Sequence, residues 1–193
     1  MIGTVSFRKL FLAGVSALAA AFVGASASAT TITGETVRVD WIIHQSGFSP
    51  STFGTATTVV GPGLELPNFS GLLDIDLGAN TITLTKATSN VGFGGAPSFD
   101  FNGFVFTDIN GTISDFTSFS ILSQTAVAGS GLSAANLSFD ANELRIDLGA
   151  TSWNSLNGST ATFSFATVPE PGVIVLFAVG IGGLACARRR RRK

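Results

Sequence analysis

The middle of this chain has few cations and no cysteine, and both absences exclude classes of protein. Residues 30–167 contain three Lys or Arg against eleven Asp or Glu, which gives this part a net charge of −8. Nucleic acids attract clustered Lys and Arg, so we expect no nucleic-acid partner. The one cysteine, Cys186, lies near the C-terminus, so no disulfide can stabilise the middle of the chain and packing alone must do so.

Residue types that carry catalysis are also scarce. His44 is the only histidine and no nucleophile motif accompanies it, so a Ser-His-Asp triad is not expected. No group of Cys and His has the spacing of zinc ligands. Asp74 and Asp76 are two residues apart on the polar side of a predicted strand, where both should be solvated. We therefore expect no catalytic residues, no cofactor and no enzymatic activity; a secreted, glycosidase-like hydrolase with an acid pair is the alternative.

Two Asp-Asn stretches resemble pieces of calcium-binding loops. They are Asp108-x-Asn110-Gly111 and Asp140-x-Asn142, and the remaining ligands of an EF-hand, including its terminal Glu, are missing from both. Asp and Asn side chains that bond their own backbone in tight turns explain both stretches more simply. We expect no metal site, and a calcium site assembled from separate loops stays open as an alternative.

The chain has no tyrosine but 17 phenylalanines, many of which alternate with polar residues. Phe fills a core without a hydroxyl that needs a partner. Short alternating segments recur roughly every ten residues, which predicts an all-β fold: an antiparallel β-sandwich of jelly-roll-like topology with more than six strands. The residues expected to point inward are Val37, Val39, Leu73, Ile75, Leu77, Phe104, Phe106, Leu144, Ile146, Leu148, Phe163 and Phe165.

Turn-forming residues between these segments predict hairpins and loops. Residues 78–80 and 140–143 should each join two strands, and Asn102-Gly103 should turn the chain between two more. The stretches 46–58 and 87–98 are rich in Gly, Ser, Thr and Pro, so we expect both to be long loops. No part of the middle of the chain shows a helical period.

The N-terminus has the pattern of a secretory signal peptide. Two basic residues precede an apolar stretch at 10–23, and the small residues after it include two A-x-A cleavage patterns. Cleavage after Ala27 or Ala29 is expected, so residues 1–29 should be the signal peptide. The export machinery and signal peptidase are then partners of the chain.

The C-terminus combines a Pro-Glu-Pro motif, an apolar run and a basic tail. Residues 172–187 carry no charge, and a helix of that length spans ~24 Å, which local bilayer thinning and snorkelling arginines can accommodate. This predicts a single transmembrane helix with the body of the protein outside and the basic tail in the cytoplasm. The stop-transfer residues are Arg188, Arg189, Arg190, Arg191, Arg192 and Lys193.

The order of these three features, with the motif at 168–171, resembles the PEP-CTERM sorting signal of bacterial exported proteins. Pro169, Glu170 and Pro171 are the residues that match the motif. The resemblance implies processing by an exosortase, a transpeptidase-like membrane enzyme, in a Gram-negative host that makes exopolysaccharide or biofilm matrix. It also implies transient anchoring in the inner membrane, followed by transfer to the cell surface or the extracellular matrix. The part at 30–167 is similar to PEP-CTERM ectodomains of unknown function.

The expected function is that of an exported surface or matrix protein. Its ectodomain, 30–167, should be a noncatalytic structural module or one that contacts exopolysaccharide through loop aromatics. A plain C-terminally anchored membrane protein is the alternative to sorting. A binder of ice or mineral would need a flat face of regularly spaced Thr, and only Thr81, Thr83 and Thr85 approach that, on one strand. The candidate ligand-contacting aromatics are Trp41, Phe48, Phe53 and Trp153.

Overall fold

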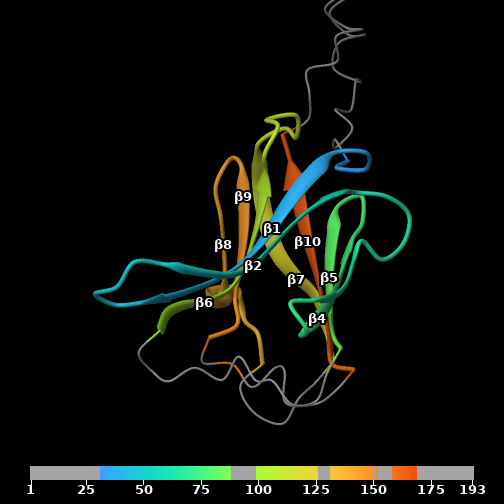
Figure 1. The fold of residues 1–193 in the computed structure, drawn as a ribbon. Helices are drawn as coiled ribbons and strands as arrows, with labels where there is room; N and C mark the ends of the chain where they lie inside the picture. The colour runs from blue at the N-terminus through green and yellow to red at the C-terminus, as the bar shows by residue number, and fades with distance from the viewer. Residues whose placement is uncertain (1–30, 88–98, 126–130, 150, 152–157, 169–193) are drawn as a thin grey trace, which may run out of the picture. The chain divides into compact units, whose positions relative to one another are not determined.

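In the computed structural model of the protein, the described residues form ten strands in two antiparallel sheets of five strands each (Figure 1). Every described residue lies in one unit of the chain, Ala29–Pro169. The all-β prediction and the expectation of more than six strands are confirmed. The structure describes residues 31–87, 99–125, 131–149, 151 and 158–168.

The two sheets draw their strands from different parts of the chain. Sheet A has the order β2-β1-β6-β9-β8, and sheet B has the order β3-β4-β5-β10-β7. The strands of sheet A are β1 (Thr36–Gln45), β2 (Ser51–Val59), β6 (Phe99–Asp108), β8 (Leu137–Phe139) and β9 (Glu143–Asp147). Those of sheet B are β3 (Leu66–Phe69), β4 (Leu73–Leu77), β5 (Thr81–Lys86), β7 (Phe116–Gln124) and β10 (Thr160–Thr167). A short 3-10 helix, η1 (Ala134–Asn136), precedes β8.

The apolar inner faces of the two sheets pack into one core. In β4 and β10, buried and partly exposed residues alternate along the whole strand, as expected for a strand with one face on a core. β2 lies near β3 and β7 lies near β8, so the two strand orders run the same way across the sandwich. The residues predicted to point inward, from Val37 through Phe165, are all buried, which confirms that prediction.

Two of the three predicted hairpins are present. β4 and β5 pair across the turn at 78–80, with Leu77 opposite Ile82, and β8 and β9 pair across the turn at 140–142. The terminal strand expected around Phe163 and Phe165 is β10. The two hairpins follow their local sequence pattern, because their strands pair with a neighbour only a few residues away. β10 instead pairs with β5 and β7, which are distant in sequence.

The predicted hairpin at Asn102-Gly103 is wrong. Both residues lie inside β6, which continues from Phe99 to Asp108 and pairs with β1 on one side and β9 on the other. Gly103 is needed there for close approach rather than for a turn, since a Cβ at this position would collide with the backbone carbonyl of Ile146 on β9. Asn102 is buried and bonded.

The predicted loop at 46–58 is also wrong over most of its length. Residues 51–59 form β2, which pairs with β1, and the connecting turn is short, with Gly47 at φ +84° and the Phe48 N–H donating to the Gln45 carbonyl. The loop prediction failed because Ser and Gly are typical of loops, whereas the threonines of this segment favour a strand. The predicted loop at 87–98 lies outside the described residues beyond Ala87.

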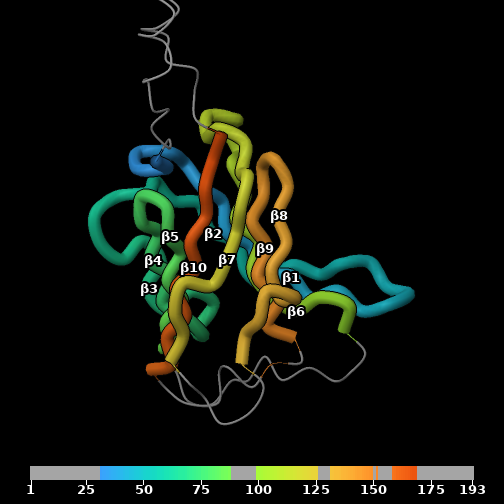
Figure 2. The backbone as a smooth tube through the Cα atoms, turned by 180° about the vertical axis from the view of Figure 1, so that it is seen from behind, coloured from blue at the N-terminus to red at the C-terminus, as the bar shows by residue number. Residues whose placement is uncertain are grey.

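The β1–β2 hairpin extends beyond the rest of both sheets (Figure 2). Its register is regular from Thr36 opposite Val59 to Trp41 opposite Gly54, and it shifts at Ile42. The extra residue on β2 at this shift is Phe53. An exposed bulge of this kind aims a side chain away from the ordinary alternation.

Candidate functional site

Two of the predicted ligand-contacting aromatics meet where the β1–β2 hairpin leaves the sandwich. The ring centroids of Trp41 and Phe53 are 5.2 Å apart, with the ring planes tilted by 41°. Trp41 packs against the core and is partly buried, whereas 57% of Phe53 is exposed. We call this pair the aromatic platform.

The indole of Trp41 is held in place by β6. Its Nε1–H donates to the Asn102 side-chain oxygen at 3.1 Å. Asn102 is itself fixed, because its backbone N–H donates to an Asp147 carboxylate oxygen that also accepts the Gly149 N–H. The polar edge of the indole is therefore bonded inside the protein, which fixes the orientation of the ring beside Phe53. The sequence pattern does not reveal this role of Asn102, because an Asn-Gly pair predicts a turn.

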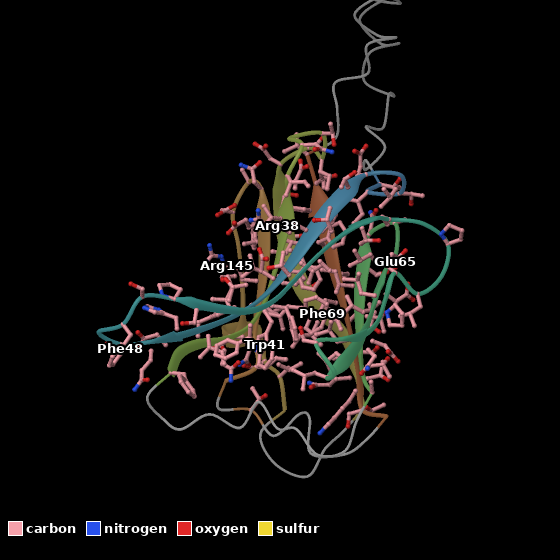
Figure 3. All side chains as sticks on the ribbon, viewed as in Figure 1. Arg38, Trp41, Phe48, Glu65, Phe69 and Arg145 are labelled. Carbon is pink, nitrogen blue, oxygen red and sulfur yellow. The ribbon has the colours of Figure 1, made fainter. Side chains whose placement is uncertain are left out.

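The other two predicted aromatics do not join the platform. Phe48 lies at the tip of the hairpin, away from Trp41, and 68% of it is exposed (Figure 3). Trp153 lies outside the described residues. Phe69 is buried and stacks edge-to-face on Phe104 in the core below.

Carboxylates on and near the outer face of β4 are held by hydrogen bonds, those of Asp74 and Glu65 by backbone N–H groups. Asp76 and Asp74 alternate with buried residues, as predicted, so they lie on the polar face of sheet B. An Asp74 oxygen accepts the Asn68 N–H at 2.7 Å. Glu65 accepts the N–H groups of Gly61 and Leu77, one on each oxygen.

Asp76 and Glu65 nevertheless interact as a pair of acids. Burial raises the pKa of Asp76 above its ordinary value, and the negative charge of Glu65 and a hydrogen bond to it raise it further. Both oxygens of Glu65 already hold the backbone together, so this carboxylate is committed to structure. We therefore expect the Asp76–Glu65 pair to make stability depend on pH rather than to catalyse hydrolysis.

The two stretches that resembled calcium loops come together. Asp108 and Asp140 both line an open depression, together with Thr107, Gly111, Asn142 and Glu143. Asp108 accepts three backbone N–H groups within the next five residues, and Asp140 accepts those of Asn142 and Glu143. These are the Asx turns that the sequence suggested. Within the part of the chain that the structure describes, no three His, Cys, Asp or Glu side chains are grouped to hold a metal ion.

The single histidine has an acidic neighbour. His44 Nδ1 lies 3.7 Å from an Asp100 carboxylate oxygen, which is beyond hydrogen-bonding distance, and both side chains are well exposed. An exposed pair of this kind is weakly coupled and in water contributes little. Among the described residues, His44 has no hydrogen-bonded partner to orient it as a general base.

The outer face of sheet B carries a two-dimensional array of hydroxyl groups. The sequence showed three threonines on β5, and the structure places β10 and β7 beside them. Hydroxyls meet across the strands in three pairs: Thr83 and Thr162 at 3.3 Å, Thr85 and Thr160 at 3.4 Å, and Ser120 and Ser164 at 2.9 Å. We call this surface the hydroxyl face.

The outer face of sheet A is different and carries ion pairs. Arg38 donates to Asp40 at 2.8 Å on β1, and Arg145 donates to Glu143 on β9. Asp40 is nearly buried and also accepts the Thr55 hydroxyl at 2.7 Å. We call this surface the ion-pair face.

The residues predicted for export and sorting lie outside the described residues. They are the cleavage residues Ala27 and Ala29, the motif Pro169, Glu170 and Pro171, and the stop-transfer cluster Arg188, Arg189, Arg190, Arg191, Arg192 and Lys193. In the described part of the chain, no helix has the length and apolar character needed to span a membrane, and the predicted span at 172–187 falls outside that part.

Comparison with known proteins identifies no relative. No protein-family model, no curated protein and no solved structure matches the chain.

Proposed function

We propose that the β-sandwich is a noncatalytic surface or matrix module that contacts a polysaccharide through the aromatic platform. The observation that carries this proposal is the tilted pair of Trp41 and Phe53, with the indole fixed by Asn102. Ligand sites combine exposed aromatic faces with a few placed polar groups, and a ring held in advance loses little entropy on binding.

The net charge of the sandwich favours neutral over acidic polysaccharides as ligands. Residues 30–167 carry a net charge of −8, which repels polyanions. The side of a sugar ring that bears C–H groups can lie on an aromatic face, and its hydroxyls can reach polar groups around it. A neutral polysaccharide therefore fits the platform better than an acidic one.

Three alanine variants test the platform. Phe53→Ala removes the exposed ring and should weaken binding to the best ligand of a neutral-glycan array by roughly tenfold, the scale of one aromatic contact. Phe48→Ala is the matched control, because this residue is more exposed but lies apart from the platform. Asn102→Ala should weaken binding while leaving both rings in the chain. Equal loss in the Phe48 and Phe53 variants would point to nonspecific stickiness instead.

For the whole chain, we propose export and sorting by an exosortase through the C-terminal signal. Support comes from the sequence alone: the signal peptide pattern, Pro169-Glu170-Pro171, the apolar run and the basic tail. The arginines stop transfer, and the helix holds the sandwich outside while Glu170, kept out of the helix by two prolines, is presented for processing. The sandwich then reaches the cell surface or matrix.

The test of sorting is the mass and membrane partition of the chain in host cells with and without the exosortase. Glu170→Ala should leave membrane insertion intact and block processing, and neutral replacements of Arg188 to Arg192 should weaken retention. If the tail through Lys193 persists in both strains, the plain anchored membrane protein is the better description.

The jelly-roll-like topology also stays a prediction. Supporting it, five of the nine connections between consecutive described strands cross from one sheet to the other. The remaining four are hairpin connections within a sheet, such as β1–β2 and β8–β9.

A further inference from the structure

We propose that β2 pairs with the same strand of a second copy of this chain, across a two-fold axis. Sheet A ends at β2, which among the described residues pairs only with β1. A strand at the edge of a sheet presents backbone N–H and C=O groups that can pair with another strand. The proposal goes beyond polysaccharide contact and does not depend on it.

Among the described edge strands, β2 alone is both long and free of charged residues, proline and bracketing side-chain hydrogen bonds over its regular part, residues 54–59, although it has a bulge at Phe53 and lies near β3. β3 is four residues long and contains Pro67, and β8 is three residues long. β7 is long, but the Gln124 side chain at its end forms two hydrogen bonds with the backbone of Leu132. β8 also lies beside β7. β2 has nine residues, none of them charged and none proline. Charged residues and prolines are the usual devices that block pairing at an edge.

The backbone pattern shows which groups face outward. Val60 pairs inward, because its N–H donates to Glu35 and its C=O accepts from Gly34. Hydrogen-bonding direction alternates along a strand, so Thr55, Thr57 and Val59 turn their backbone groups to the free edge. The side chains of the same three residues are exposed, and 57% of Val59 is accessible.

The chemistry of this edge favours a copy of itself as the partner. The sandwich is strongly acidic, so two copies repel wherever acidic surfaces meet, but two β2 strands oppose no like charges. An edge without charges offers nothing to attract a basic or acidic partner strand. An antiparallel pair is also self-complementary about a two-fold axis, which closes as a dimer.

The alternation of outward-facing backbone groups along β2 determines which residues of the two β2 strands lie opposite each other. With the axis at Thr57, Thr57 lies opposite Thr57 of the second copy, and Thr55 lies opposite Val59. All three outward residues of each strand then bond, and the regular part of β2 is used in full. The contact is small, so we expect a weak dimer that is favoured when the protein is crowded at a surface.

A charge swap tests the pairing. The full chain, purified in detergent, should show a concentration-dependent dimer by light scattering. Thr57→Lys and Thr57→Glu should each lower the association constant by at least about tenfold, because like charges then face each other at the axis. Mixing the two variants should restore dimers. A monomer at all concentrations, or no recovery on mixing, overturns the proposal.

Cross-linking tests the register, in a Cys186→Ser background. Residues opposite each other in a hydrogen-bonded pair have Cα atoms about 5.5 Å apart, within the range that a disulfide bridges. Thr57→Cys should therefore form a covalent dimer on oxidation. Thr55→Cys is the matched control, on the same face of the same strand, and should not, since the two copies of residue 55 are four residues out of register. Equal cross-linking at both positions, or open-ended growth instead of a dimer, overturns the two-fold pair.

Discussion

The two sheets have similar inner faces and very different outer faces. Both inner faces carry aliphatic residues and Phe, which form one core. Outside, the ion-pair face of sheet A joins charges two residues apart on the same strand, whereas the hydroxyl face of sheet B joins hydroxyls across strands. Both inner faces pack into the same core, so both need apolar residues. The outer faces contact solvent, so their polar residues can differ.

The difference has consequences for stability. An ion pair within one strand, such as Arg145 with Glu143, responds to salt and adds little to the pairing of strands. A hydroxyl pair across strands is insensitive to salt and links neighbours in the sheet. On the outer side of sheet B, Asp74 and Asp76 on β4 are the charges that stand next to the hydroxyl face. The two faces should therefore respond to different solution conditions.

The largest expected effect tests whether the inner faces are equivalent. Ile146→Ala in sheet A and Ile82→Ala in sheet B should each lower the free energy of unfolding by about 2–5 kcal/mol, because both side chains are almost fully buried. Urea unfolding followed by circular dichroism measures both. A loss below about 0.5 kcal/mol at either site would show that the two faces do not share one core.

Removing the most buried charge of the ion-pair face comes next. Asp40→Ala leaves Arg38 and the Thr55 hydroxyl without their acceptor and should cost about 1–3 kcal/mol of unfolding free energy. Arg145→Ala is the control on the same face, and its exposed pair should contribute less than about 1 kcal/mol. Similar costs for the two variants would mean that burial does not distinguish the pairs.

The hydroxyl face should tolerate change better. Thr83→Val keeps the shape of the side chain and loses its hydrogen bond to Thr162, so the expected cost is about 0.2–1 kcal/mol. A double-mutant cycle with Thr162→Val isolates the pair energy, which should not change with added salt. A salt-dependent coupling would contradict the proposed contrast between the faces.

The smallest effect concerns pH at the margin of the hydroxyl face. The folded state binds the Asp76 proton more tightly than the unfolded state, because burial and Glu65 raise the pKa of this carboxyl. Stability should fall as pH rises from the ordinary pKa of an aspartate, about 4, through the raised value. Asp76→Asn should flatten this slope in urea titrations taken across the window. Asp74→Asn retains both Asp76 and Glu65 and should keep it.

Local pattern was enough to predict the inward residues and strands such as β4 and β9, but it did not predict β2, β3 or β7. The alternation around Ile75 and Ile146 has the period of a strand, and period depends only on neighbours along the chain. The alternation at Asn102-Gly103 was interrupted by the same residues that make hairpin turns, so the sequence favoured the wrong structure there. Gly103 is required inside β6 because the backbone carbonyl of Ile146, on the neighbouring strand β9, leaves no room for a side chain.

The candidate sites divide in the same way. Residue type alone pointed to Trp41, Phe48 and Phe53, but only the pairing of β1 with β2 and β6 joins Trp41 to Phe53, fixes its indole on Asn102 and leaves Phe48 apart.

The chain by itself determined the composition of both sheet faces, the alternation that buries one side of strands such as β4 and β10, and the order of the Pro-Glu-Pro motif, apolar run and basic tail. Tertiary structure decided which strands are neighbours. It thereby placed Thr162 beside Thr83, Glu65 beside Asp76, and β2 at an edge. The physical reason is that a strand's period is local, whereas its neighbours are chosen by burial of whole faces, to which residues far apart in sequence contribute together.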